Sequence, residues 1–191
     1  MPPKIQFTKA DLLRAAFKIT RHHGIHALNA RAIAKELGCS TQPIFRAFRS
    51  MDEVRREMMR MAMDLYGLYI TRSSASVARP YLHSGLAYIS FAREEAELFK
   101  LLFMRDRVSE GTDKENSDSK LDYVIGLVME STGLTQEHAR RFHRHLWIYT
   151  HGLATMVATK FLNVGVEEAE QLLGDQYHAT RALFALPPLP R

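Results

Sequence analysis

Apolar residues recur every three to four positions along most of the chain, which is the spacing of amphipathic α-helices. No segment shows the strict alternation of apolar and polar residues that marks a half-buried strand. The pattern therefore predicts an all-α protein. About nine helices are expected, at residues 9–23, 30–37, 41–48, 51–73, 80–93, 94–104, 121–131, 136–162 and 166–185. Residues 106–120 are polar and aperiodic and are expected to form a connecting loop.

Capping and stop residues locate the first two helices. Thr8 is a good N-cap, and Asp11 lies three residues later, where its negative charge favours the helix dipole. Gly24 is expected to end this helix. Asn29 caps a second helix of about two turns, and Gly38 closes it. The apolar face of the first helix is predicted to contain Ala10, Leu13, Ala16, Phe17 and Thr20.

Pro43 lies inside the third expected helix and marks its start. With Ser40 as the N-cap, Pro43 is the third helical residue, where its missing N–H has no intrahelical partner to lose. The helical spacing then separates two faces. The expected packing face contains Thr41, Ile44, Phe45 and Phe48, and the opposite face contains Gln42, Arg46 and Arg49.

The second and third helices, joined by a tight turn, form a helix-turn-helix. The second helix of such a pair can present its N-terminal residues to base edges in the DNA major groove. Gln42 can form a paired hydrogen bond with adenine, and Thr41 and Pro43 offer apolar surface to thymine methyl groups. These three residues are the candidates for reading sequence.

Phosphate contacts are expected beside them. Arg31, Arg46 and Arg49 suit contacts that position the protein without reading sequence. Asn29 and Ser40 lie at the expected N-termini of the two helices, where free N–H groups can accept phosphates.

The net charge of +5 is unevenly distributed along the chain. Residues 1–60 contain 12 Lys and Arg against 5 Asp and Glu, a net of +7, so the remaining 14 and 16 leave residues 61–191 at −2. A short helix pair with a basic face also occurs as a purely structural element. A basic first third of the chain favours a polyanionic partner instead.

Other site classes find no support in the sequence. No uninterrupted apolar run reaches the length of a membrane span, and the N-terminus lacks a signal peptide's apolar core. Cys39 is the single cysteine, which fits a reducing cytoplasm. The histidines and glutamates lack metal-site or catalytic spacing, and no phosphate-binding loop is present. We expect a cytoplasmic protein that is not an enzyme and uses no metal or cofactor.

The stretch LNARAIAKELGCSTQPIFRAFRSMDEV, residues 28–54, resembles the helix-turn-helix of TetR family transcriptional regulators. The resemblance extends from about Thr8 to Tyr69. It implies a DNA-binding domain of three helices at 6–66, with the helix-turn-helix proper at 29–48. It also implies a C-terminal effector-binding and dimerisation bundle at 67–186.

Three positions depart from the family pattern. Phe45 replaces the usual Tyr, Ala47 a common His and Met51 a common Lys. Each change removes a phosphate contact that the resemblance would place there. Phe45 keeps its place among the DNA-binding candidates, and Arg46 and Arg49 are expected to replace the lost contacts.

The stretch HLWIYTHGLATMVATKF resembles TetR C-terminal domains that carry a Trp-x-x-x-His-Gly motif, here Trp147, His151 and Gly152. Trp147 and His151 are four residues apart and share a helix face. Two interpretations stay open: these side chains form the wall of an effector cavity, or they pack in the core or a dimer interface.

The resemblance further implies a pocket among the fourth to eighth helices and a homodimer formed through the last two helices, 136–162 and 166–185. The expected pocket residues share aromatic or flexible apolar side chains. They are Tyr66, Tyr88, Phe91, Phe99, Phe103, Tyr123, Met129, Trp147 and His151.

We therefore expect a homodimeric, DNA-binding transcriptional repressor. It would bind a pseudo-palindromic double-stranded operator and be released by a small-molecule effector. One rival is an all-α enzyme with an incidental basic head, which would turn over a ligand in its C-terminal body. Another is a protein-interaction adaptor with a fully packed C-terminal core.

Overall fold

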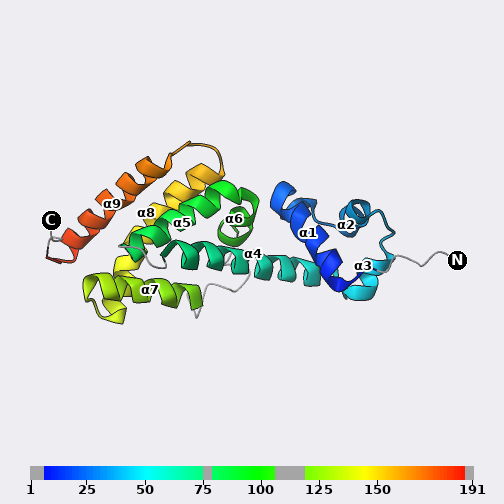
Figure 1. The fold of residues 1–191 in the computed structure, drawn as a ribbon, viewed down its shortest axis with the longest axis horizontal. Coiled ribbons are helices and arrows are strands. Elements are labelled where there is room, and N and C mark those ends of the chain that lie inside the picture. The colour runs from blue at the N-terminus through cyan, green and yellow to red at the C-terminus, as the bar shows by residue number, and fades with distance from the viewer. Residues whose placement is uncertain (1–6, 75–78, 106–118, 188–191) are drawn as a thin grey trace. The chain divides into compact units, whose positions relative to one another are not determined.

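The computed structural model describes residues 7–74, 79–105 and 119–187. In these ranges all of the regular secondary structure is helical, as predicted (Figure 1). Most of the expected 106–120 loop lies outside the described residues. The α-helices are α1 (Lys9–His23), α2 (Ala30–Leu37), α3 (Gln42–Ala47), α4 (Met51–Ser74), α5 (Pro80–Glu94), α6 (Ala96–Phe103), α7 (Ser119–Thr132), α8 (Gln136–Ala158) and α9 (Val166–Leu183), and a 3-10 helix spans Ile25–Ala27. No described helix is both long and apolar enough to span a bilayer.

The chain divides into two compact units. The N-terminal unit comprises residues 1–65 and 95–105, and the C-terminal unit comprises residues 66–94 and 106–191. The N-terminal unit therefore contains α1 to α3, the first part of α4, and α6. The expected domain limits, 6–66 and 67–186, place α6 with the C-terminal bundle instead, and those limits stay a prediction.

Local signals set both ends of α1. The Thr8 hydroxyl accepts the Asp11 N–H, and the Asp11 carboxylate accepts the Thr8 N–H at 2.9 Å, which completes a capping box. Gly24 ends the helix with φ of 78°. The positive φ requires glycine, whereas the Glu97 carboxylate, which would lie 2.6 Å from a Cβ at this position, is the end of a flexible side chain on α6 and can move aside.

The buried face of α1 differs from the predicted one. The helix buries Leu12, Ala15, Ala16, Ile19 and Thr20, whereas Ala10 is exposed and Leu13 and Phe17 are only partly buried. The burial of Ala16 and Thr20 is confirmed, but the centre of the buried face lies about one residue, or 100° around the helix, from the predicted one. Both α2 and α6 pack on α1.

An ion pair joins α6 to α1. Glu95, the N-cap residue of α6, is 2% exposed, and its carboxylate accepts two N–H groups of the Arg21 guanidinium, one of them at 2.6 Å. A buried carboxylate needs such a partner, because its desolvation is otherwise uncompensated.

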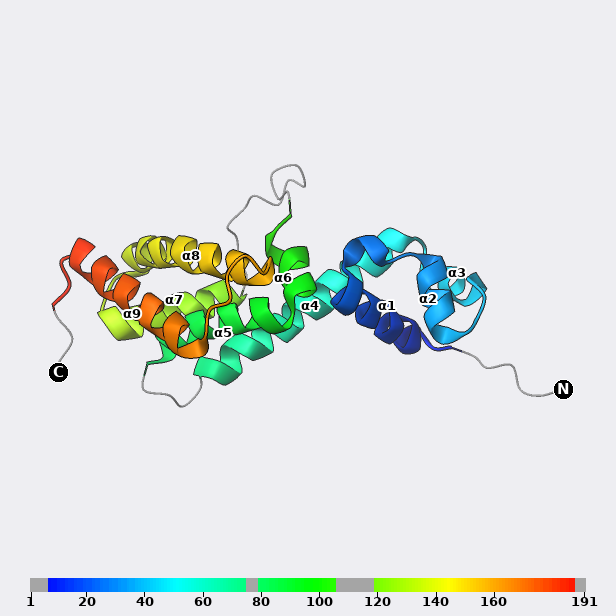
Figure 2. The ribbon, with the colours of Figure 1, turned by 90° about the horizontal axis from the view of Figure 1, so that it is seen from above.

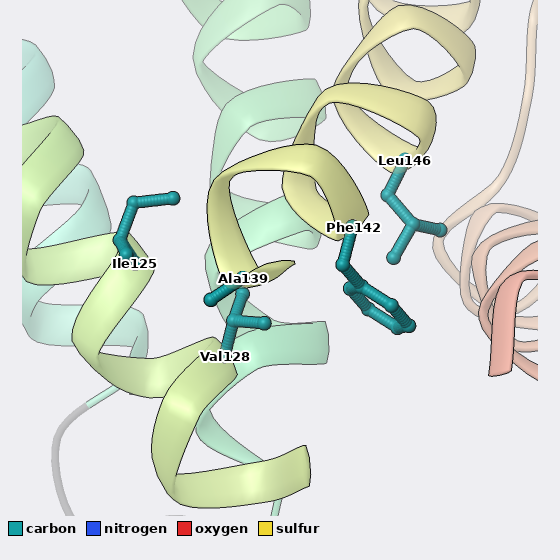
Figure 3. Packing of buried hydrophobic residues seen from close by; sticks show 5 residues of the cluster. All are labelled: Ile125, Val128, Ala139, Phe142 and Leu146. Carbon is teal, nitrogen blue, oxygen red and sulfur yellow. The ribbon is translucent and has the colours of Figure 1, made fainter. Parts of the chain in front are cut away.

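In the C-terminal unit, α5, α7, α8 and α9 pack on one another (Figures 1 and 2). One core cluster lies between α7 and α8 (Figure 3). It consists of Ile125 and Val128 from α7 and Ala139, Phe142 and Leu146 from α8. Each set repeats at helical spacing, and the Phe142 ring also packs on Tyr177 of α9, so the cluster extends to that helix.

The predicted start of α8 is confirmed and its predicted end is wrong. Thr135 caps the helix by accepting the His138 N–H. The helix ends at Ala158, not at Leu162. Lys160 adopts the left-handed conformation, with φ of 59°, and the Leu162 N–H turns back to the Met156 carbonyl. Likewise α9 ends at Leu183 rather than at residue 185.

Candidate nucleic-acid interface and effector site

The turn between α2 and α3 has a defined backbone. Asn29 caps α2, and its side-chain oxygen accepts the Ala32 N–H at 2.9 Å. Gly38 ends α2 in the left-handed conformation, with φ of 65°. The Cys39 N–H then bonds to the Ala34 carbonyl at 2.9 Å. This glycine-closed turn directs the chain into α3, as a helix-turn-helix requires.

Pro43 lies in the first turn of α3, although the predicted cap was wrong by one residue. The N-cap is Thr41 rather than Ser40, no side chain caps the helix, and Pro43 is the second helical residue. Thr41 already has helical dihedral angles, and its carbonyl accepts the Ile44 N–H at 3.1 Å. The chain therefore turns without needing an N–H from the proline.

The two faces of α3 are mostly as predicted. Ile44 and Phe48 are buried, and they anchor the short helix at positions i and i+4. Phe45, however, is 57% exposed, so its assignment to the packing face is wrong. It follows Ile44 by 100° around the helix, outside the narrow buried stripe of a six-residue helix. Gln42 and Arg46 are exposed.

The candidate phosphate-binding cations are accessible. Arg31, Arg46 and Arg49 are all exposed, and within the described ranges no carboxylate forms an ion pair with them. By contrast, Arg55 and Arg60 bind carboxylates of their own helix, α4. The exposed arginines of α2 and α3 thus retain free donors for an external anion.

The other candidates lie close to them in the chain. Asn29 and Ser40 are exposed, and Thr41 and Pro43 are partly exposed. The side-chain oxygen of Asn29 already caps α2. A phosphate at this position would therefore be bound by the free backbone N–H groups at the N-terminus of α2.

Two residues that sequence reasoning did not identify, Glu53 of α4 and Lys9 of α1, are linked to the segment that follows α3. The Glu53 carboxylate accepts the Arg49 N–H at 2.8 Å and binds the Lys9 ammonium at 3.0 Å. The Arg49 backbone, followed by Lys9, holds the pKa of Glu53 below its usual range. The Ser50-x-x-Glu53 spacing is a capping-box pattern and could have drawn attention to Glu53.

Part of the expected effector site forms a continuous aromatic cluster in the C-terminal unit. The Tyr66 ring lies 5.8 Å from Tyr88 and 5.4 Å from Phe91, centroid to centroid. The Tyr88 hydroxyl lies 2.9 Å from Nδ1 of His151. The Trp147 ring stacks on His151 at 5.0 Å. We call Tyr66, Tyr88, Phe91, Trp147 and His151 the aromatic cluster.

Burial keeps the two titratable side chains of the aromatic cluster, His151 and Tyr88, uncharged. It lowers the pKa of His151 and raises that of Tyr88, so both are neutral near pH 7. The Trp147 side chain hydrogen-bonds to Tyr88, and an indole N–H can only donate. A neutral imidazole carries one N–H, so the direction of the hydrogen bond between the Tyr88 hydroxyl and Nδ1 of His151 follows from the tautomer of the histidine.

The remaining candidates lie elsewhere. Tyr123 and Met129 are exposed on α7. Phe99 and Phe103 belong to α6 in the N-terminal unit, where their rings lie 5.3 Å apart. A role for these four residues in an effector pocket stays a prediction.

A second tyrosine–histidine pair joins the same two helices, and the sequence analysis missed it. The Tyr81 hydroxyl of α5 lies 3.0 Å from Nδ1 of His143 on α8. Burial, followed by the charge of Arg140, lowers the pKa of His143 to about 4. Tyr81 precedes Tyr88 by two helical turns, and His143 similarly precedes His151, so the pairs repeat along the α5–α8 interface.

Comparison with known families assigns both parts of the chain. Residues 12–58 match the family described as bacterial regulatory proteins, tetR family, and residues 82–185 match the Tetracyclin repressor-like C-terminal domain. The second match alone covers more than half of the chain. The chain belongs to the TetR family. It is accordingly a DNA-binding transcriptional regulator, in agreement with the exposed helix-turn-helix.

Solved structures share the fold of this TetR-family regulator. A TetR-like transcriptional regulator from Rhodococcus sp. RHA1 has a TM-score of 0.68 at 15% identity, over 96% of this chain and 98% of that chain. A protein of unknown function from Rhodococcus sp. RHA1 has a TM-score of 0.69 at 20% identity, over 94% and 97%. Comparison with curated proteins gave no match.

Proposed function

We propose that this TetR-family regulator is a repressor that binds a pseudo-palindromic operator as a homodimer and is released by a small molecule. The observation that carries the proposal is the accessible face of α3, where Gln42 and Arg46 are exposed opposite the buried Ile44 and Phe48. A short helix anchored on one side can enter the major groove with the other.

On this proposal the residues of the helix-turn-helix divide their tasks. Gln42, with Thr41 and Pro43, contacts base edges. The exposed ring of Phe45 adds apolar contact, for which a thymine methyl group is the natural partner. The phosphate contacts come from Arg31, Arg46 and Arg49 and from the helix N-termini near Asn29 and Ser40.

Exposed apolar side chains support dimerisation through α8 and α9. Ile148 is 60% exposed and Phe161 78% exposed, and Val166 and Leu183 are also open to solvent. A second copy related by a two-fold axis would cover these apolar side chains, whose exposure to water is otherwise unfavourable. The same axis would place two copies of α3 on two half-sites of the operator.

The aromatic cluster supports an effector site in the C-terminal unit. Apolar rings combined with a few hydrogen-bonding groups suit a bulky, flat, largely apolar molecule. Such a molecule needs only a different affinity for the DNA-competent and DNA-incompetent forms, so regulation requires no catalysis. On this proposal the chain acts in the cytoplasm on a double-stranded DNA operator, through binding alone.

In vitro selection of random duplexes by the purified protein tests the proposal. We expect enrichment of an inverted repeat whose half-sites lie about one helical turn apart. Selection with the Gln42→Ala variant should change the preferred base at one position in each half-site. Enrichment of no sequence, or an unchanged preference in this variant, would contradict the assignment of α3 as the reading helix.

A further inference from the structure

Only three residues, Phe48, Arg49 and Ser50, separate α3 from α4. Phe48 is buried, and its N–H donates to the Ile44 carbonyl at 2.9 Å, so the first of the three is anchored. Ser50 accepts the Glu53 N–H at 3.3 Å through its hydroxyl and caps α4. Arg49 lies between these two anchored positions, and its side chain is exposed.

The Glu53 carboxylate holds the backbone of Arg49. One of its oxygens accepts the Arg49 N–H at 2.8 Å. In an ordinary capping box, the glutamate would reach back to the N–H of the N-cap residue, here Ser50. Glu53 reaches one residue further, and thereby joins the start of α4 to the end of α3.

The second oxygen of the same carboxylate binds α1. The Lys9 ammonium lies 3.0 Å from it and 4.8 Å from the centroid of the Phe48 ring. A single carboxylate therefore connects the first turn of α1, the segment between α3 and α4, and the first turn of α4. All of these residues belong to the N-terminal unit.

We propose that Glu53 is a positioning residue for DNA binding, which holds the Arg49 backbone so that the Arg49 guanidinium meets a DNA phosphate. The proposal rests on the phosphate contact assigned to Arg49 above. Without the hydrogen bond that the Arg49 N–H donates to Glu53, the exposed Arg49 peptide can rotate. The backbone then no longer holds the guanidinium in a fixed position, and the side chain must be ordered each time the protein binds DNA.

Electrostatics alone predicts the opposite effect. A carboxylate close to DNA repels phosphates, so its removal should strengthen binding. Asp52 offers a matched control, because it is the preceding residue, is exposed, and pairs only with Arg55 of its own helix among the described residues. Asp52→Ala and Glu53→Ala remove the same charge from the same turn.

The experiment measures the affinity of these variants for a duplex selected by the wild-type protein. Asp52→Ala should bind as tightly as wild type or slightly more tightly, whereas Glu53→Ala should bind roughly three- to tenfold more weakly. Glu53→Gln retains an oxygen that can accept the Arg49 N–H, and should restore wild-type or tighter affinity. Thermal unfolding of each variant shows whether the DNA-binding unit is intact.

A double-mutant cycle with Arg49→Ala then separates positioning from a general structural role. If Glu53 acts through Arg49, adding Glu53→Ala to Arg49→Ala should cause little further loss. Two results would overturn the role of Glu53 but leave the phosphate contact of Arg49 standing. One is that Glu53→Ala causes an equal loss of DNA affinity with and without Arg49→Ala. The other is that Glu53→Ala binds DNA as tightly as Asp52→Ala. Wild-type binding by Arg49→Ala would instead overturn the phosphate contact on which the inference rests.

Discussion

The indole ring of Trp147 lies against the imidazole of His151, with centroids 5.0 Å apart and planes inclined by 16°. Trp147 is the chain's single tryptophan and is 40% exposed, so its fluorescence reports directly on this pair. A protonated imidazole quenches a stacked indole more strongly than a neutral one.

Because burial lowers the pKa of His151, we expect the emission of Trp147 to fall on acidification with a midpoint below 6.5, the usual value for histidine. A pH titration of intrinsic fluorescence on the folded protein measures this midpoint. The His151→Gln variant should lose the transition. A midpoint above 6.5 in the wild type would mean that His151 lies near a carboxylate, not in the neutral aromatic cluster.

His143 makes folding stability depend on pH. Its folded-state pKa is about 4, below the value of 6.5 for an unfolded chain, so the unfolded state binds the extra proton first. Its contribution is therefore fully present above pH 6.5 and is lost as pH falls toward 4. The expected loss is at most about 3 kcal/mol.

Urea unfolding at a series of pH values from 7 to 4 checks this prediction. His143→Gln keeps a hydrogen-bonding side chain but cannot titrate, so it should be less stable at pH 7 and show a shallower acid decline. If stability fell equally steeply with pH in both proteins, His143 would not be the source of the pH dependence.

Gly24 and Gly38 both have positive φ, but their surroundings differ. A Cβ at Gly24 would meet the Glu97 carboxylate, whereas a Cβ at Gly38 would meet nothing within 4 Å. Gly38→Ala should cost about 1 kcal/mol of unfolding free energy, from backbone strain alone. Gly24→Ala should cost about 3 kcal/mol, since its φ of 78° and ψ of 168° suit glycine almost exclusively. Chemical denaturation of both variants gives the comparison, and equal losses would contradict the larger backbone strain expected at Gly24.

An acidic residue on α8 should break the dimer. Ile148→Asp places a charge on the exposed apolar surface assigned to the second copy, so we expect a monomer by analytical ultracentrifugation. Since two half-sites then bind independently, operator affinity should also fall, by at least tenfold. Tyr123→Asp, at an exposed aromatic residue of α7, is the control and should remain dimeric. A dimeric Ile148→Asp protein would place the interface elsewhere.

Features that depend on neighbouring residues could be predicted from the sequence. Thr8, Asn29 and Thr135 cap their helices as expected, and Gly24 and Gly38 end theirs, because each signal acts through hydrogen bonds within one turn. The position of Pro43 in the first turn of α3 was also predictable, although the cap itself was misassigned by one residue.

Features that depend on distant contacts could not be predicted. The buried face of α1 follows from the packing of α2 and α6, and the exposure of Phe45 follows from the narrow contact of α3. The bonds from Tyr81 and Tyr88 to histidines of α8 join residues more than 60 positions apart, and no spacing within one helix indicates them. The placement of α6 in the N-terminal unit likewise involves a distant contact, the ion pair between Arg21 and Glu95.

The salt dependence of operator binding tests the central claim most directly. In a plot of log affinity against log salt concentration, replacing a phosphate-binding arginine should reduce the slope by about one. Arg46→Ala and Arg49→Ala should each show this reduction. Arg60→Ala should keep the wild-type slope, because Arg60 is exposed but bound to Glu57 and Asp64 on α4. Identical slopes for all four proteins would contradict the placement of α3 on DNA.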